Sequence, residues 1–290
     1  MLDVLPFYLA VGALAGLLSG LFGIGGGIVV VPLLAWAFPL QGFADERVMV
    51  TAVATSLASI AFTSLAAVRA HRRLGALRWD WVYRLAPWLL AGTALGALAG
   101  DGLPARALKF LYALFLLYVA ARLVLVRTET GRDGQGDRWR IAATGLGIGA
   151  LSAVLGIGGG TLTVPYLARQ GLAMKNAAAV SSACGLPIAL GGAATYAWLG
   201  WPRADLPPFS FGYIYLPALF GIAACSAWTA PWGARLAHRL PAQRMKRLFA
   251  VLLALVAARF AQQGFDPAWP GEALHRIGAG VNFLTGGPQP

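Results

Sequence analysis

Two glycine-rich stretches of nearly the same sequence decide the fold: residues 17–27 read LLSGLFGIGGG, and residues 150–160 read ALSAVLGIGGG. A proline follows each stretch, Pro32 after the first and Pro165 after the second, so both landmarks are offset by the same 133 positions (150 minus 17, and 165 minus 32). Internal similarity at this distance predicts a chain built from two copies of one structural unit.

The duplication continues beyond the glycines. Leu-Pro-Ala at 103–105 begins a segment that ends in Ala-Ala-Arg at 120–122, and the same pattern returns at 240–242 and 257–259. Between these landmarks, Thr55-Ser56 aligns with Ser181-Ser182. The predicted domains are a first repeat over residues 1–126, a linker over 127–137, a second repeat over 138–262 and a C-terminal tail over 263–290.

Charged residues are scarce for a chain of this length. Only 12% of the 290 residues are charged and 58% are hydrophobic, whereas an ordinary soluble domain is about 25% charged. The stretches without Asp, Glu, Lys or Arg are 4–44, 48–68, 85–100, 141–168, 176–202 and 206–234. Several exceed the roughly 20 apolar residues that cross a bilayer. The composition predicts an all-α polytopic membrane protein and excludes a soluble enzyme, a disordered scaffold and a secreted disulfide domain.

Each repeat is expected to contain three long helices and one broken hairpin. The predicted long helices are 47–69, 82–100, 105–126, 174–199, 212–230 and 242–262. The uncharged stretch around the second glycine motif, 141–168, spans only about 42 Å as a helix, which is too short for two crossings of a ~30 Å core. Each glycine stretch is therefore predicted to be a helical hairpin that breaks at the glycines and has at least one short arm.

The basic residues predict the orientation of the two repeats. A formal net charge of +12 on a soluble domain would suggest nucleic acid, but here the cations lie between apolar stretches, as the positive-inside rule describes, and no nucleic-acid partner is expected. Segment 69–84 carries five basic residues, whereas its counterpart 200–211 carries one; segment 231–247 also carries five, against two in 101–109. Equivalent loops should therefore lie on opposite sides of the membrane. The repeats are then inverted, with segments 69–84, 127–140 and 231–247 in the cytoplasm and both termini outside.

The glycines allow two interpretations. They could let helices pack closely, as small residues do in membranes, or they could interrupt a helix so that its second half points free N–H groups into a cavity and binds an anion. A nucleotide-binding loop is excluded because no strand precedes the motif and no Lys-Ser/Thr follows it. The candidate substrate-binding residues are Gly25, Gly26, Gly27, Thr55, Ser56, Gly158, Gly159, Gly160, Ser181, Ser182 and Cys184. For Cys184, simple packing is an equal alternative.

The charged residues limit the chemistry further. All 11 acidic residues fall in predicted loops, tails or helix ends, which argues against carboxylate-driven proton coupling and against a cationic substrate. No residue spacing suggests a metal site, and no cofactor is expected. Arg122 and Arg259 lie so close in sequence to Lys109 and Arg247 that one charge of each pair falls at membrane depth. The two arginines either extend to the interface or face an anion path.

The paired Ser-x-x-x-Gly-Ile-Gly-Gly-Gly segments, each followed by a proline, together with the Thr-Ser or Ser-Ser pair that begins the next long helix, resemble the TauE/SafE family of sulfite exporters. The resemblance covers residues 4–262. It implies a multi-pass protein of the bacterial inner membrane that carries sulfur-containing anions, such as sulfite or the sulfonate sulfoacetate. Ser181-Ser182 departs from the Thr-Ser pair often found in the second half of the family, so a hydroxyl remains but its geometry can differ.

Three functional hypotheses follow. The first is an anion transporter without carboxylate-based proton coupling, which exports sulfur-containing anions or carries another small anion. The second is a membrane-embedded enzyme, which would need a paired acid or a His/Asp/Glu cluster that the apolar spans lack. The third is a membrane subunit that does not transport, against which the two complete repeats speak. The expected partners are a small anionic substrate, the lipid bilayer and possible further copies of the chain.

Overall fold

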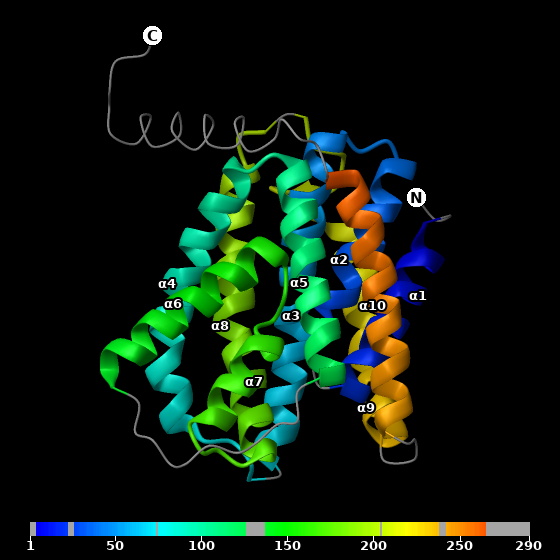
Figure 1. The fold of residues 1–290 in the computed structure, drawn as a ribbon. Coiled ribbons are helices and arrows are strands. Elements are labelled where there is room, and N and C mark those ends of the chain that lie inside the picture. The colour runs from blue at the N-terminus through cyan, green and yellow to red at the C-terminus, as the bar shows by residue number, and fades with distance from the viewer. Residues whose placement is uncertain are drawn as a thin grey trace, which may run out of the picture.

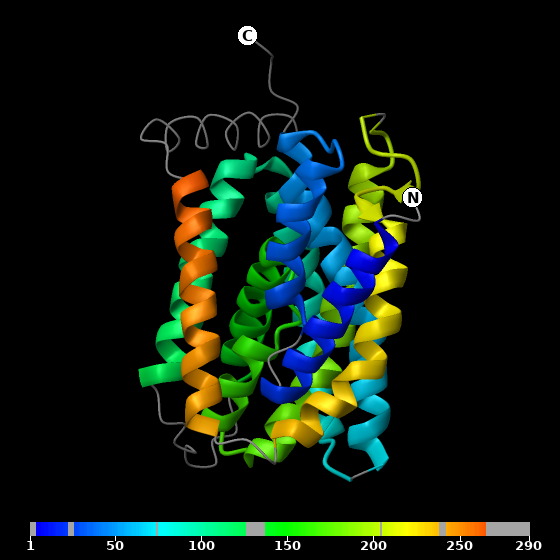
Figure 2. The ribbon, with the colours of Figure 1, turned by 90° about the vertical axis from the view of Figure 1, so that its right-hand side faces the viewer.

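The computed structural model describes residues 4–22, 26–73, 75–125, 137–203, 205–237 and 242–264, and Figures 1 and 2 show their arrangement as a helical bundle. These residues form ten helices and one two-stranded antiparallel hairpin. The predicted linker, except Asp137, and the tail beyond Gly264 lie outside the described residues.

The helices follow the predicted order closely. In the first half they are α1 (Leu5–Phe22), α2 (Gly27–Leu40), α3 (Asp45–Arg73), α4 (Trp79–Gly102) and α5 (Ala105–Leu125). In the second half they are α6 (Arg138–Leu155), α7 (Gly160–Arg169), α8 (Met174–Gly200), α9 (Leu216–Ala237) and α10 (Ala242–Gly264). Both glycine motifs interrupt a helical hairpin, and α7 is a short arm of 10 residues, as predicted.

The two hairpins enter the bundle from opposite ends, the α1–α2 pair from the upper end in Figures 1 and 2 and the α6–α7 pair from the lower end. The connection between α3 and α4 lies at the lower end, whereas the corresponding connection between α8 and α9 lies at the upper end. Equivalent connections of the two halves are thus found at opposite ends of the molecule.

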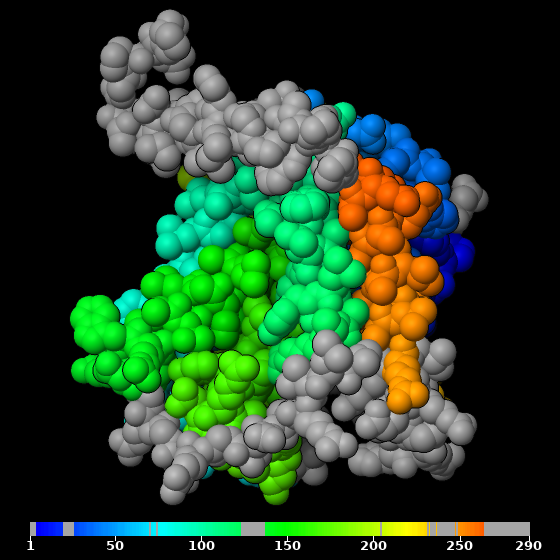
Figure 3. All heavy atoms as spheres, in the orientation of Figure 1, coloured from blue at the N-terminus to red at the C-terminus, as the bar shows by residue number. Residues whose placement is uncertain are grey.

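The helices of one half pack on those of the other. Helix α1 lies along α9, and its counterpart α6 lies along α4, while α3 pairs with α8 and α5 pairs with α10. Figure 3 shows α5 and α10 adjoining along one face. Each of these pairings joins a helix before the predicted linker to one after it, α4 with α6 included, because α6 begins at Arg138. The bundle therefore has a single shared interior.

Small residues make the closest of these packings possible. A Cβ added at Gly12 or Gly16 of α1 would collide with the backbone of α9, and one added at Gly92 or Gly96 of α4 would collide with the backbone of α6. Gly149 of α6 makes the same approach to α4. Glycines spaced by four positions let membrane helices approach each other at backbone distance. Close packing, one of the two interpretations of glycine in this sequence, is therefore the function of these five.

Among the described residues, three helices are long and apolar enough to cross a membrane by length and composition, namely α3, α4 and α8. Shorter apolar helices are found over Leu5–Ser19, Gly27–Leu40, Leu216–Ala230 and Phe249–Gln263. Many large hydrophobic side chains are exposed on the outside of the bundle, Leu95, Trp198 and Phe220 among them. This surface is typical of a protein surrounded by lipid, as the composition predicted.

The helix predicted over 212–230 begins later than expected, and this prediction is wrong at its start. Residues 210–211 and 214–215 instead form the hairpin strands β1 (Ser210–Phe211) and β2 (Ile214–Tyr215), and α9 runs from Leu216 to Ala237. The hairpin turns at Gly212, whose φ is +55°. The buried Tyr215 is held by a 3.0 Å hydrogen bond from its N–H to Thr55 Oγ1 of α3. A contact between residues 160 positions apart determines this local structure.

Ion pairs join the two halves close to the β1–β2 hairpin. Arg47, at the start of α3, contacts Asp205 at 2.9 Å, and Arg203 contacts Asp101 at 3.6 Å. The guanidinium of Arg47 lowers the pKa of the Asp205 carboxyl below its usual value by donating a hydrogen bond to it. These pairs connect the ends of α3 and α4 to the segment between α8 and α9.

Candidate functional site at the two broken hairpins

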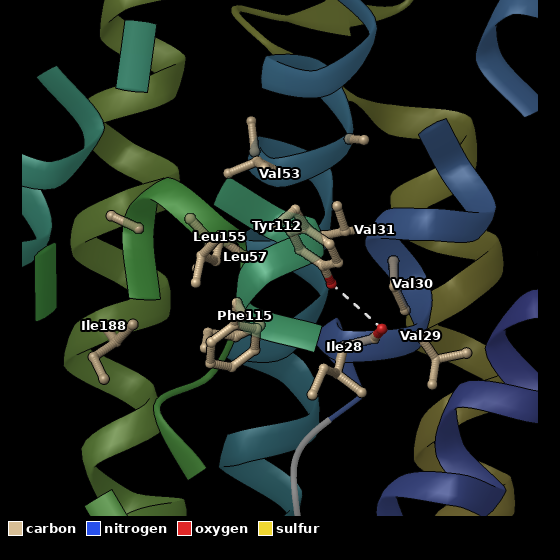
Figure 4. Packing of buried hydrophobic residues seen from close by; sticks show 14 of the residues in the cluster. Ile28, Val29, Val30, Val31, Val53, Leu57, Tyr112, Phe115, Leu155 and Ile188 are labelled. Carbon is tan, nitrogen blue, oxygen red and sulfur yellow. Dashed lines mark hydrogen bonds between the residues drawn. The ribbon is translucent and has the colours of Figure 1, made fainter. Parts of the chain in front are cut away.

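The two glycine motifs meet inside the bundle. A Cβ added at Gly27, the first residue of α2, would collide with the carbonyl oxygen of Gly156, which follows α6. Ser56 of α3 donates a 2.8 Å hydrogen bond to that same oxygen. Around Gly156 lie Val31 of α2 and Val53 of α3; Figure 4 shows these two side chains among the buried residues of the interior. The breaks in both hairpins therefore share one buried region.

At the start of α2 the surroundings are apolar. Gly26, the N-cap, has helical backbone angles (φ −68°) and makes no side-chain capping bond. The buried side chains that follow include Ile28 and Val30. The hydroxyl of Tyr112, on α5, donates to the carbonyl oxygens of Gly27 and Ile28 at 3.3 Å each, and Figure 4 shows it pointing at the first turn of α2.

At the start of α7 the backbone bends sharply. Gly156 closes α6 with φ +65°, and Gly159, the N-cap of α7, has φ +71°. This left-handed region favours glycine because a Cβ would meet the backbone. No side chain caps α7; the N–H groups of Leu162 and Thr163 both donate to the carbonyl oxygen of Gly159, at 3.0 and 2.7 Å.

Two buried hydroxyls flank the same glycine. Thr163 Oγ1 lies 3.3 Å, and Ser152 Oγ lies 3.7 Å, from the position that a Cβ on Gly159 would take. Both residues are fully buried, and neither hydroxyl has a hydrogen-bond partner among the described residues. Buried polar groups in native proteins are almost always hydrogen-bonded. The two hydroxyls at this helix start are therefore hydrogen-bond donors for which the described residues supply no acceptor.

A cation reaches the same helix start. Arg122, near the end of α5, donates a 2.8 Å hydrogen bond from Nη1 to the carbonyl oxygen of Thr161 in the first turn of α7. The Arg122 side chain is only partly buried. Of the two arginines considered for an anion path, Arg122 is therefore the one beside a glycine motif. Arg259 is exposed on α10.

The predicted hydroxyl residues do not form one set. Thr55 accepts the N–H of Tyr215, and Ser56 donates to Gly156, so both side chains hold the fold together. Ser182 donates to the carbonyl of Ala178 one turn earlier in α8, at 2.9 Å. Ser181 is buried with a hydroxyl that has no partner among the described residues, and Cys184 is completely buried.

The predicted glycines also differ among themselves. Gly25 lies outside the described residues. Gly26 has room, since an added Cβ would meet Ala15 at an ordinary 3.6 Å, whereas a Cβ on Gly158 would approach Ile60 to 2.9 Å and one on Gly159 would approach Ile188 to 2.5 Å. Gly160 begins α7. Crowding is therefore severe in the second motif and slight at Gly26.

Three residues of this region were not among the predicted site residues: Ser152, Thr163 and Tyr112. A signal for Thr163 was available. At the common offset of 133, Thr161 and Thr163 align with Ile28 and Val30, so hydroxyls in one copy replace aliphatic side chains in the other. Comparing the two copies position by position would have found this difference. Within the described ranges, no group of three or more His, Cys, Asp or Glu could hold a metal ion.

Comparison with known proteins is consistent with this architecture. Residues 8–260 match the model of the family described as sulfite exporter TauE/SafE. A probable membrane transporter protein of Haemophilus influenzae is 36% identical over 250 residues, covering 86% of this chain and 95% of the relative. Another probable membrane transporter protein, from Methanocaldococcus jannaschii, is 24% identical over 255 residues, covering 87% and 94%.

The match covers both glycine motifs, all the paired helices and the candidate site at the start of α7. The resemblance identified from the doubled glycine motif is thereby confirmed, and the chain is a multi-pass membrane protein of a transporter family. It belongs to the sulfite exporter TauE/SafE family.

Proposed function

We propose that the protein exports sulfur-containing anions, sulfite or organosulfonates such as sulfoacetate, across a bacterial inner membrane. The observation that carries the proposal is the start of α7, where an uncapped helix end, unpartnered buried hydroxyls and a nearby guanidinium occur together. A helix N-terminus favours anions because its N–H groups and dipole are both positive there. The oxygens of a sulfite or sulfonate accept hydrogen bonds, and this region supplies donors.

The test is a flux assay with purified protein in liposomes. The panel contains sulfite, sulfoacetate, sulfolactate, thiosulfate and sulfate, with a carboxylate of matched size as control. We expect transport of at least one sulfite or sulfonate and weaker transport of the carboxylate. Preference for the carboxylate would instead favour the second candidate, a permease for another small organic anion. Absence of flux for every anion would favour a membrane subunit that does not transport.

Transport is proposed to be electrogenic and not coupled to protons. An inside-negative potential drives an anion outward, with about 2.3 kcal/mol per charge per 100 mV. No acidic residue lies in the first turn of α2 or of α7, and export driven by the potential needs no proton-coupling carboxylate. Flux should therefore follow an imposed potential and carry current. Electroneutral flux that requires a proton or sodium gradient would contradict this part of the proposal.

The two halves are proposed to be inverted repeats, with both termini outside the cell. The opposite entry of the hairpins and the opposite location of equivalent connections support this arrangement, as does the matching of the α1–α9 and α6–α4 pairs. Single cysteines at Gly75 and at Trp201, which is exposed beside the buried Gly200, should be labelled from the cytoplasm and from outside, respectively. Labelling of both from one side would exclude the inverted arrangement.

A further inference from the structure

We propose that the substrate anion is bound by one hairpin only. Its seat is the start of α7, with the hydroxyls of Ser152 and Thr163 as direct donors and Arg122 as the neighbouring cation. The start of α2 only packs the two hairpins together and takes no part in binding the anion. This inference rests on the proposed function and adds to it, because it names the binding residues and makes the two repeats unequal.

The hydroxyl geometry supports a ligand at this place. Ser152 comes from α6 and Thr163 from α7, on either side of the break, and both oxygens lie beside Gly159. The two side chains are 0% exposed, and both oxygens lack a partner in the part of the chain that the structure describes. Two unsatisfied hydroxyls converging from separate helices on one uncapped N-terminus are more than packing requires. An oxyanion would satisfy both.

The charge at this position points to an anion. The bond from Arg122 to the Thr161 carbonyl holds a guanidinium against the first turn of α7. This bond uses one of the five N–H donors of the group. A guanidinium and a helix N-terminus side by side attract the same kind of ligand, and together with hydroxyl donors they suit a headgroup with several acceptor oxygens.

The start of α2 offers no equivalent groups among its described residues. Ile28 and Val30 stand where the second copy has Thr161 and Thr163, and both are buried. The nearby hydroxyls are already engaged, because Ser56 donates to Gly156 and Tyr112 donates to the carbonyls of Gly27 and Ile28. The contact of Gly27 with the Gly156 carbonyl fills the remaining space at that point.

The chemistry of the seat favours a compact, singly charged headgroup with three oxygens. The two hydroxyls, which come from separate helices, can each bond a different oxygen of a sulfite or sulfonate, whose three oxygens point in three directions. A carboxylate holds its acceptor lone pairs in one plane and fits donors from separate helices less well. We therefore expect sulfonate over carboxylate selectivity to depend on Thr163.

The decisive variant is Thr163→Val, which introduces the side chain already present at the equivalent position 30. Binding of sulfite and sulfoacetate to the purified full-length protein should weaken about tenfold or more, the effect of one charge-assisted hydrogen bond. The melting temperature without anion should stay equal or rise, because an unsatisfied buried hydroxyl is removed. A residue with a merely structural role would not combine weaker binding with unchanged or greater stability.

Four further variants complete the experiment. Thr163→Ser keeps the hydroxyl and should retain most of the binding. Ser152→Ala should weaken binding as Thr163→Val does. Arg122→Gln should also weaken binding at low salt, and the difference in affinity from the wild type should become smaller at high salt. Thr93→Val removes an equally buried threonine hydroxyl that bonds the Leu89 carbonyl within α4, and it should leave binding unchanged.

The outcomes separate this inference from the proposed function. If the wild type transports sulfite or sulfonate and both Thr163→Val and Ser152→Ala bind these anions as tightly as it does, the one-sided seat is overturned while the function stands. If the wild type binds and transports only another anion, and Thr163→Val abolishes that binding, the seat is supported and the proposed substrate is wrong. Should Thr163→Val fail to fold, Ser152→Ala alone decides by the same criterion.

Discussion

The α1–α2 and α6–α7 hairpins share a motif and differ in what surrounds the start of their second helix. In the first, Gly26 is helical and has space beside it, and aliphatic side chains follow; in the second, Gly159 is left-handed and crowded, and threonines follow. Helix α5 contacts both breaks, through Tyr112 at α2 and Arg122 at α7. The corresponding residues of α10 are Phe249, which has no hydroxyl, and Arg259, which is exposed. The two hairpins thus share a glycine motif, and different residues at a few positions make their two breaks chemically unequal.

The largest expected difference between the hairpins is the response to alanine at the N-cap glycine. Gly159→Ala would place a Cβ in the left-handed region and 2.5 Å from Ile188, which should destabilise the protein by about 2–5 kcal/mol and eliminate flux. Gly26→Ala meets only Ala15 at 3.6 Å and should be neutral or stabilise by about 0.4–1 kcal/mol. Thermal unfolding in detergent and flux in liposomes measure both effects.

From the sequence alone, both glycine motifs are candidate binding positions, and valine at Gly26 or at Gly159 is expected to eliminate flux. In the structure Gly159 is crowded and Gly26 is not, so the two positions are expected to differ. A folded Gly26→Ala protein without flux would show that the substrate passes close to α2. The proposed difference between a hairpin that binds the anion and one that does not would then be wrong.

The second difference concerns the paired serines of α3 and α8. Ser56→Ala removes the only described side-chain donor to the Gly156 carbonyl and leaves a buried acceptor unsatisfied, so a loss of about 1–3 kcal/mol in unfolding free energy is expected. Ser182→Ala loses only a bond to its own helix, and that carbonyl keeps its helical partner. We expect a change within about 0.5 kcal/mol. Denaturant or thermal unfolding of the two variants, compared at one pH, gives the ranking.

A smaller effect is expected for Tyr112→Phe, which makes α5 like α10 at this position. The variant loses two long hydrogen bonds of 3.3 Å to Gly27 and Ile28 but keeps the ring contact with Phe260. The expected loss is about 0.5–1.5 kcal/mol, with anion binding nearly unchanged. Strong weakening of binding in a protein of normal stability would place the substrate at α2 and reverse the comparison.

Much of the architecture could be predicted from sequence, because its determinants are local or repeated. Apolar length located the long helices, and the glycine motifs located both breaks. The β1–β2 hairpin could not be predicted, since it depends on the bond between Tyr215 and Thr55 across 160 positions. The role of Thr55 and Ser56 was missed for the same reason: a hydroxyl in an apolar helix looks equally available whether or not a distant backbone group engages it. Of the predicted residues, Gly159, Gly160 and Arg122 lie at the start of α7, where we propose that the anion binds.

The pairing of α1 with α9 has a consequence for how the protein is made. The glycine face of α1 fits the backbone of α9, and Thr229 donates a hydrogen bond to the Ala13 carbonyl across that contact. Helix α4, the partner of α6, has already been synthesised when α6 is made. The partner of α1 is α9 (Leu216–Ala237), which is synthesised much later than α1. At the usual ~5–20 residues per second, nearly two hundred residues take roughly 10–40 s. During that interval the first helix has to be sheltered by lipid or by the insertion machinery, so its membrane integration precedes its folding.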